Sequence, residues 1–315
     1  MPQRSNGDGR TSISLVELIA LRARVGRARL APLRSRSARH GQQTSALFGR
    51  GMDYAESRVY QAGDDVRRLD WRLTARSGKL HTKLFQEDRE GCLLILVDTH
   101  ASMRFGTRVR FKSVQAARAA AWAAWYATRA GERVGMMPFG HADHLLRPRA
   151  GARGALAVCG ALADWDASSG MAAREQPLAV PQESLADALV RAGRVSHGAN
   201  RVLLISDGFS CDASARQRLL DISRRSGLAV LVVADPLELA PAPAGRYPLE
   251  HDGERRDVVL QTDRQRADFQ QALGAGPARL HELARSLGLG CRIIDTTVDP
   301  FDAVSSLLGA TRGRR

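Results

Sequence analysis

The stretch that decides the fold is LLILVDTHASMRFG, residues 93–106. Its first five residues are all apolar, as expected for a strand of a parallel sheet that is covered on both faces. The run ends at Asp98, and a small polar loop follows with His100 and Ser102. In an open parallel sheet, ligands bind beyond the carboxyl ends of the strands. The stretch therefore predicts a central strand that carries polar side chains to a candidate ion site.

Apolar strands and helices alternate on either side of this pattern. ERVGMMPFG (132–140), RVLLISDG (201–208) and LAVLVVAD (228–235) read as further strands, and the alanine-rich segment 110–131 reads as a long helix. Nearly continuous apolar strands that alternate with helices are typical of an α/β fold. We predict a mainly parallel sheet with helices on both faces.

A second strand also ends in an aspartate. Asp207 follows LLIS, and Ser184 opens the helix that precedes this strand. Two carboxylates and two hydroxyls that meet at one sheet edge form the hard-oxygen shell preferred by Mg²⁺ or Mn²⁺. The alternative is that strand-end aspartates only cap the helices that follow them. The combination favours an ion site.

These residues resemble the metal-ion-dependent adhesion site of von Willebrand factor type A-like domains, which has a D-x-S-x-S motif, a later threonine and a later aspartate. The resemblance implies a type A-like, Rossmann-like fold with metal positions at Asp98, Ser102, Ser184 and Asp207. Serine in place of threonine at 184 keeps a hydroxyl. His100 stands where the pattern has serine, and imidazole suits Zn, Cu, Fe or Ni better than Mg. We therefore expect an altered site that includes His100.

A second resemblance lies upstream. Residues 49–90 resemble the bacterial family called domain of unknown function 58, in which a G-D-D-x-R-x-x-D-W signature precedes the type A-like domain. The resemblance continues through RFGTRVRFKSVQAARAAA and RVLLISDGF, and so covers nearly the whole chain. The residues of this structural or interaction signature are Gly63, Asp64, Asp65, Arg67, Asp70, Trp71 and Arg76.

Two interpretations of the signature remain open. Its aspartates and arginines form either a buried ion-pair and hydrogen-bond network, with Trp71 as the hydrophobic anchor, or a surface that recognises a partner. We favour the buried network, because paired charges around a tryptophan need no ligand.

The family resemblance also implies a function. Members are commonly associated with MoxR-type AAA+ ATPases, which implies a non-enzymatic, chaperone-like adaptor that helps to assemble or activate a client protein. An Asp or Glu of a partner would complete the coordination of an ion at the predicted site. The chain has no G-x-x-x-x-G-K-[ST], H-E-x-x-H or G-x-S-x-G motif, so we expect no catalytic and no cofactor-binding residues.

The composition supports one alternative, and the site residues support another. The formal net charge of +14 would suit a basic nucleic-acid-binding protein. Aromatic residues make up only 5% of the chain, which weakens the case for binding single strands. The minor alternative is a metal-dependent hydrolase that uses His100 and the two aspartates, although the sequence offers no positioned nucleophile.

The predicted organisation has three parts. Residues 1–45 form a basic, partly disordered segment with a short amphipathic helix. Residues 46–90 form a β-rich signature block, and residues 91–315 form the type A-like domain, with a hairpin insertion at about 241–262.

The expected location is the cytoplasm. Four widely spaced cysteines show no C-x-x-C pattern and read as reduced thiols. No apolar stretch approaches the ~18 residues that span a bilayer. The segment ISLVELIALRARVGRARL (13–30) is interrupted by charges and is no signal peptide. Its basic amphipathic pattern leaves peripheral membrane contact open, but we favour packing of this helix on the body of the protein or on a partner.

Overall fold

The computed structural model describes residues 7–27, 52–87, 91–140, 145–175, 183–195, 199–251 and 254–309. The chain divides into two compact units. The sheet unit comprises Met1–Ser37 and Gly91–Arg315, and the signature unit comprises Ala38–Glu90.

The sheet unit is built on six strands in the order β10-β7-β6-β3-β4-β5. They are β3 (Cys92–Asp98), β4 (Arg133–Phe139), β5 (Leu146–Arg149), β6 (Arg201–Ser206), β7 (Gly227–Ala234) and β10 (Gly290–Asp295). All pairs are parallel except β4 with β5, which lies antiparallel at one edge. Every residue of the central strand β3 is buried. The predicted mainly parallel, type A-like α/β sheet is confirmed.

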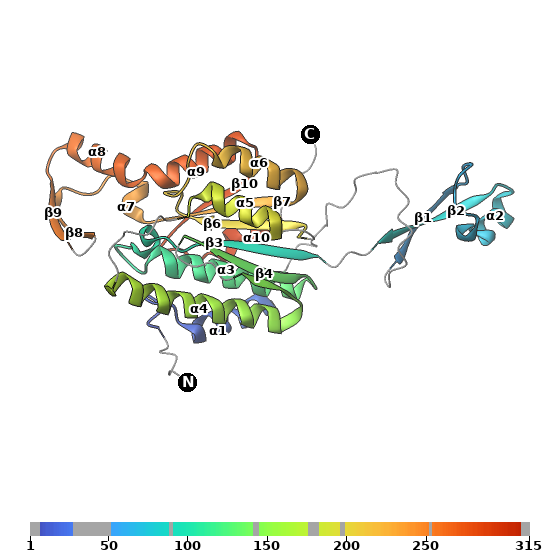
Figure 1. Cartoon of the computed structure of the whole chain (residues 1–315), viewed down its shortest axis with the longest axis horizontal. Coiled ribbons are helices and arrows are strands. Elements are labelled where there is room, and N and C mark those ends of the chain that lie inside the picture. Colours follow the sequence, from blue (N-terminus) through green and yellow to red (C-terminus); the bar gives the residue numbers. More distant parts are fainter. Residues whose placement is uncertain are drawn as a thin grey trace. The chain divides into compact units, whose positions relative to one another are not determined.

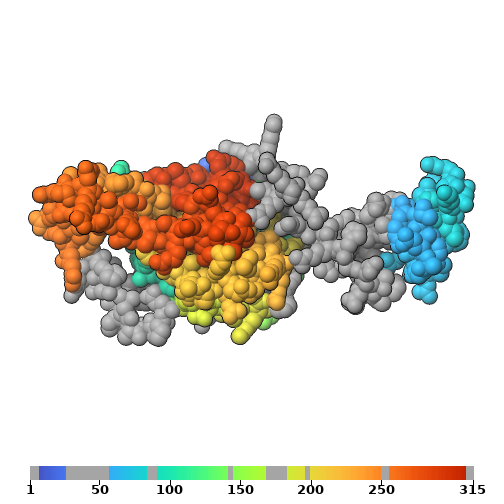
Figure 2. Space-filling view, turned by 90° about the horizontal axis from the view of Figure 1, so that it is seen from above, coloured from blue at the N-terminus to red at the C-terminus, as the bar shows by residue number. Residues whose placement is uncertain are grey.

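Helices cover both faces of the sheet (Figure 1). One apolar core joins the sheet to α1 (Leu15–Arg27), α3 (Lys112–Arg129), α4 (Gly151–Glu175) and α10 (Phe301–Gly309). A second core joins the opposite face to α5 (Leu185–Val195), α6 (Ala215–Arg225) and α9 (Ala275–Ser286). Figure 2 looks onto this second layer, where α6 in yellow lies beside α9 in red. None of the helices within the described ranges is long and apolar enough to cross a membrane.

The N-terminal amphipathic helix packs on the body of the sheet unit. Helix α1 lies against α3 and α4, with Leu18, Leu21 and Val25 buried. The indole Nε1 of Trp125 donates a hydrogen bond of 3.0 Å to the Leu18 carbonyl oxygen. An amphipathic helix is stabilised mainly by burying its apolar face, so α1 belongs to the sheet unit. The predicted boundary at residue 45 lies outside the described residues.

The start of the chain is also more ordered than predicted. Asp8 accepts hydrogen bonds from the backbone N–H groups of Arg10, Thr11 and Ser12, which fixes a turn before α1. These N–H groups lower the pKa of the Asp8 carboxyl, chiefly through Arg10 and Ser12. The predicted disorder therefore does not apply to residues 7–12, and residues 1–6 lie outside the described residues.

The hairpin predicted at about 241–262 is present. Its strands are β8 (Gly245–His251) and β9 (Glu254–Leu260), which pair antiparallel, while the predicted turn at 252–253 lies outside the described residues. Helices α7 (Pro236–Leu239) and α8 (Asp263–Leu273) flank it. A small apolar core of Leu237, Ala242 and Leu260 holds this part together.

The signature unit is an antiparallel pair of strands, β1 (Met52–Val59) and β2 (His81–Glu87), with short helical segments between them. These are the 3₁₀ helix η1 (Val66–Arg68) and α2 (Trp71–Ser77). Gly63 has a φ of +108°, a conformation that side chains rarely adopt, which explains glycine at the turn after β1.

Candidate functional site

Asp98 ends β3 with both carboxylate oxygens already bonded. Oδ1 accepts from the His100 backbone N–H at 3.0 Å and lies 2.6 Å from the His100 ring Nδ1. Oδ2 accepts from the hydroxyl of Ser206 at 2.6 Å. All three side chains are buried, so the bonds are shielded from water.

The two ring nitrogens of His100 both face acceptors. Nδ1 faces the Asp98 carboxylate, and Nε2 lies 2.9 Å from the Glu183 carbonyl oxygen. Only the imidazolium form donates from both nitrogens. Burial lowers the pKa of His100, but the hydrogen bond and charge of Asp98 outweigh burial, so the pKa is raised. The Asp98 carboxylate is thus paired with a cationic side chain of its own loop.

The second aspartate, Asp207, is paired with a buried lysine. Lys112 Nζ lies 2.9 Å from Asp207 Oδ2 and 2.6 Å from Glu238 Oε1. The other oxygen of the Asp207 carboxylate accepts from the Phe209 backbone N–H. The other oxygen of the Glu238 carboxylate accepts from the Asp235 backbone N–H. All three charged side chains are nearly inaccessible, and the Lys112 ammonium also lies over the rings of Phe105 and Phe209.

Tight backbone packing sets the position of Asp207. Gly208 has a φ of +81°, and a Cβ there would lie 2.3 Å from the Gly276 carbonyl oxygen. Its N–H donates to Ser206 Oγ at 2.9 Å, which links the Asp207 turn to the Asp98 carboxylate through one hydroxyl. Only glycine fits this close approach between the turn and α9.

The two predicted hydroxyl ligands are placed differently from the two carboxylates. Ser184 Oγ accepts from the Asp187 N–H at 3.1 Å and donates to the Asp187 carboxylate at 2.9 Å, so it caps α5. Ser102 Oγ is buried and has no hydrogen-bond partner. The structure therefore brings Asp98, His100 and Asp207 to one edge, whereas the Ser184 hydroxyl serves a helix terminus.

As arranged here, the predicted residues do not fit a divalent cation. Each oxygen of Asp98 and Asp207 already accepts a hydrogen bond or pairs with His100 or Lys112. Within the described ranges, no group of three or more His, Cys, Asp or Glu side chains is arranged to hold a metal ion. Binding of Mg²⁺ or Mn²⁺ would require displacement of these cations, and it stays a prediction.

Sequence reasoning missed three residues of this network, Lys112, Ser206 and Glu238. A signal for Lys112 was available, because only three of the 47 basic residues are lysines. Ser206 directly precedes Asp207, and Glu238 follows a third strand-end aspartate, Asp235. The Asp235 carboxylate accepts from the N–H and the hydroxyl of Thr107 at 2.8 and 2.6 Å, so it holds the loop that follows β3.

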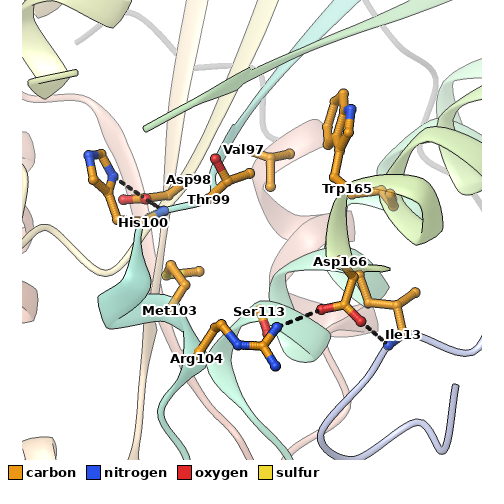
Figure 3. Close-up of a pocket in the computed structure, with 11 residues that line it drawn as sticks. Ile13, Val97, Asp98, Thr99, His100, Met103, Arg104, Ser113, Trp165 and Asp166 are labelled. Atoms are coloured by element: carbon orange, nitrogen blue, oxygen red, sulfur yellow. Dashed lines mark hydrogen bonds and ion pairs between the residues drawn. The ribbon is translucent and has the colours of Figure 1, made fainter. Parts of the chain in front are cut away.

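A small cavity lies beside Asp98, under the N-terminal segment (Figure 3). Its volume is about 40 Å³, which is room for one or two water molecules and not for an organic substrate. At its far side, Asp166 accepts from the Ile13 N–H at 2.7 Å and pairs with Arg104 at 3.4 Å (Figure 3). Burial raises the pKa of Asp166, while the Ile13 N–H and the charge of Arg104 act to lower it. This contact fixes the entry to α1.

Four loops at the carboxyl edge of the sheet expose large apolar side chains. We define the carboxyl-edge surface as Val109, Phe209, Leu239 and Val298, which follow β3, β6, β7 and β10 respectively. These loops are held in place by the hydrogen bonds of Thr107 with Asp235 and by a 2.8 Å bond from Gln115 Nε2 to the Val298 carbonyl oxygen. Val109, Leu239 and Val298 therefore lie on segments that hydrogen bonds hold in place.

Within the signature unit itself, the predicted network around Trp71 is not buried. Trp71 is 67% exposed in this unit, and Arg67 and Arg76 are exposed as well. Asp64 pairs with Arg58 at 2.6 Å. The aspartates mainly satisfy backbone N–H groups of the turns and helices that follow them. A network that holds this unit to the sheet stays a prediction.

Those capping roles are specific for each aspartate. Asp65 accepts from the Arg67 N–H and caps η1, and Asp70 accepts from the Leu73 N–H and caps α2. Asp70 also accepts from the Ser57 hydroxyl at 2.8 Å, which ties α2 to β1. The Leu73 N–H and then the Ser57 hydroxyl lower the pKa of the Asp70 carboxyl. Gly63 and the three aspartates thus set the local structure of the signature unit, while Trp71 faces outward.

Fold and site together define an α/β domain whose strand-end charges are paired within the chain. The chain belongs to the family described as "Protein of unknown function DUF58", which matches residues 56–277. Uncharacterized proteins from Mycobacterium tuberculosis and Mycobacterium bovis are 40% identical to it over 98 residues. That match covers 31% of this chain and 31% of each relative, so the chain spans about a third of the length of these curated relatives.

Solved structures with a similar fold include two bacterial proteins. The conserved hypothetical protein BatB from Bacteroides thetaiotaomicron has a TM-score of 0.41 at 16% identity, with 69% of this chain and 97% of that chain covered. A von Willebrand factor type A protein from Catenulispora acidiphila has a TM-score of 0.40 at 13% identity, with coverage of 73% and 44%.

Proposed function

We propose that this protein is a non-enzymatic adaptor that acts with a MoxR-type AAA+ ATPase to assemble or activate a client protein. Its family and fold indicate a protein-interaction domain. The partner ATPase and the cytoplasmic location are parts of the proposal.

The observation that supports this function best is the carboxyl-edge surface. Exposed apolar side chains on loops that are fixed by hydrogen bonds lose little conformational entropy when they bind, which favours protein–protein contact. Phe209 occupies a central place, because its N–H bonds to Asp207 and its ring lies 5.2 Å from the Lys112 ammonium. An aromatic side chain held at the edge of a buried charge network is suited to anchoring a partner.

The charge of the chain defines the chemistry of the partner. The formal net charge is +14, and Arg108 is exposed beside Val109 on the carboxyl-edge surface. A complementary partner presents apolar side chains within an acidic rim, and its association is accelerated at low ionic strength. The same charge would attract nucleic acid, so the test must distinguish binding of a protein partner from binding of nucleic acid.

The test is quantitative binding of the purified full chain to a purified MoxR-type ATPase. We expect Phe209→Ser to weaken binding by about tenfold or more, as for a truncated aromatic anchor. The matched control is Leu156→Ser, an exposed leucine on α4 that lies outside the carboxyl-edge surface. Leu156→Ser should keep the thermal midpoint of the wild type, whereas Phe209→Ser should lower it, because the Phe209 ring covers the Lys112 ammonium. Binding is therefore compared at a temperature at which both variants are folded.

Two outcomes would contradict the proposal. Equal loss in the two variants would show that exposed apolar area in general causes the binding. Absence of ATPase binding, together with salt-sensitive binding of duplex DNA, would favour the nucleic-acid alternative. Loss of ATPase binding in EDTA would leave the adaptor role standing and would support capture of a partner's carboxylate through a bound ion.

A further inference from the structure

The Lys112 ammonium lies between two buried carboxylates that follow neighbouring strands of the sheet. It reaches from the start of α3 to Asp207, after β6, and to Glu238, in α7 after β7. The Lys112 side chain is 1% exposed, and so is that of Glu238, while that of Asp207 is fully buried. No bulk water is available to stabilise these charges, so each needs the others.

The charge balance of this group requires a resident cation. Burial of an unpaired carboxylate costs several kcal/mol or drives its protonation, and here two carboxylates are within bonding distance of one ammonium. Burial lowers the pKa of Lys112, but the charges of Asp207 and Glu238 outweigh burial and raise it. Burial raises the pKa of Glu238 to about 6, and Lys112 opposes this effect. The ammonium is therefore the cation that lies within bonding distance of both carboxylates and opposes the effect of burial on Glu238.

Lysine has the right shape for this role. Its ammonium is a compact point charge with rotatable donors, whereas a guanidinium is planar and needs a wider, forked arrangement of acceptors. The chain uses arginine for nearly all of its positive charge, with only three lysines, and one of them occupies this position. Two aromatic rings, of Phe105 and Phe209, cover the ammonium at 5.7 and 5.2 Å.

We propose that Lys112 is the permanent cation of this sheet edge and takes the place of a divalent metal ion, so that the edge keeps its shape without metal. The imidazole of His100 pairs with the neighbouring Asp98 carboxylate at 2.6 Å and likewise takes the place of a metal ion there. It follows that removal of the Lys112 side chain converts the Asp207–Glu238 pair into a divalent-cation site. This inference is independent of the partner and of the proposed adaptor role.

The test compares the full-length wild type with Lys112→Ala and Lys112→Met. Thermal midpoints are measured in EDTA, Mg²⁺ and Mn²⁺, and Mn²⁺ binding is followed by electron paramagnetic resonance. We expect no metal response in the wild type. Lys112→Ala should unfold at a lower temperature in EDTA, recover in Mn²⁺ by ligand linkage, and bind Mn²⁺ at least about tenfold more tightly than the wild type.

Two variants serve as controls. Lys112→Met removes the charge but fills the space with an unbranched side chain, so it should be destabilised without recovery in Mn²⁺. Lys79→Ala removes an exposed lysine of the signature unit and should behave as the wild type in every solution.

Two results would overturn the proposal. One is Mn²⁺ binding by the wild type that is lost in Asp207→Asn, since the site would then already hold a metal. The other is a folded Lys112→Ala variant whose midpoint and Mn²⁺ affinity match those of the wild type. If Lys112→Ala folds only in Mn²⁺, the proposal is supported directly. If it folds in neither solution, the wild-type Mn²⁺ titration decides the question.

Discussion

At the scale of single residues, the two serines nearest in sequence to Asp98 and Asp207 have opposite environments. Ser206 Oγ donates to Asp98 and accepts from the Gly208 N–H, and it is fully buried. Ser102 Oγ is buried without a partner. A hydroxyl that satisfies two buried groups contributes to stability, whereas a buried hydroxyl without a partner costs free energy.

We therefore predict that Ser206→Ala lowers the free energy of unfolding by about 1–3 kcal/mol, because it leaves two buried groups unsatisfied. Ser102→Ala should change the free energy of unfolding by no more than about 0.5 kcal/mol, or raise it slightly, because no hydrogen bond is lost. Urea unfolding of both variants in EDTA and in Mg²⁺ measures the difference. A large, magnesium-dependent loss in Ser102→Ala would show that this hydroxyl serves an ion after all.

At the scale of elements, α1 shows how a polar-looking segment can be integral to a core. Its buried residues Leu18 and Leu21 pack in the same core as Ala120 and Trp122 of α3. Glu17 forms an ion pair with Arg118 of α3, and the guanidinium of Arg24 lies 5.5 Å from the Trp122 ring. The arginines that make this helix look detached and basic thus contact the body of the sheet unit.

We predict that Leu21→Ala lowers the free energy of unfolding by about 2–5 kcal/mol, as for a buried leucine whose removal leaves a cavity. The control on the same helix is Val16→Ala. Because Val16 is exposed, this substitution should change the free energy of unfolding by no more than about 0.5 kcal/mol. Chemical denaturation followed by circular dichroism measures both. Equal effects would mean that α1 is not a stable part of this core.

The accuracy of sequence reasoning differs between elements for physical reasons. Continuous apolar runs such as 93–97 identify buried parallel strands, so the sheet was predictable. The helical periodicity of α1 also indicated packing on the body or on a partner, but periodicity does not identify which surface covers the apolar face. The two aspartates of the site were visible at strand ends. Lys112 was not visible as the partner of Asp207, because the two lie more than ninety residues apart along the chain and only the fold brings them together.

At the scale of the whole molecule, the signature unit is an insertion between two segments of the sheet unit. Helix α1 precedes it and strand β3 follows it, yet both belong to one apolar core. None of the three apolar cores found among the described residues includes a residue of 52–87. Stability of the sheet unit should therefore not depend on the inserted residues, as is common for domain insertions.

We predict that replacement of residues 38–90 by a flexible Gly/Ser linker leaves a folded sheet unit, because every side chain of its apolar cores is retained. Differential scanning calorimetry should show a thermal midpoint within about 4 °C of the wild type, the shift that about 1 kcal/mol produces in a domain of this size. The control variant lacks residues 1–27 instead and should lose much more stability, since α1 is removed. Collapse of the first variant to a state without a cooperative transition would show that the signature unit is required to form the sheet.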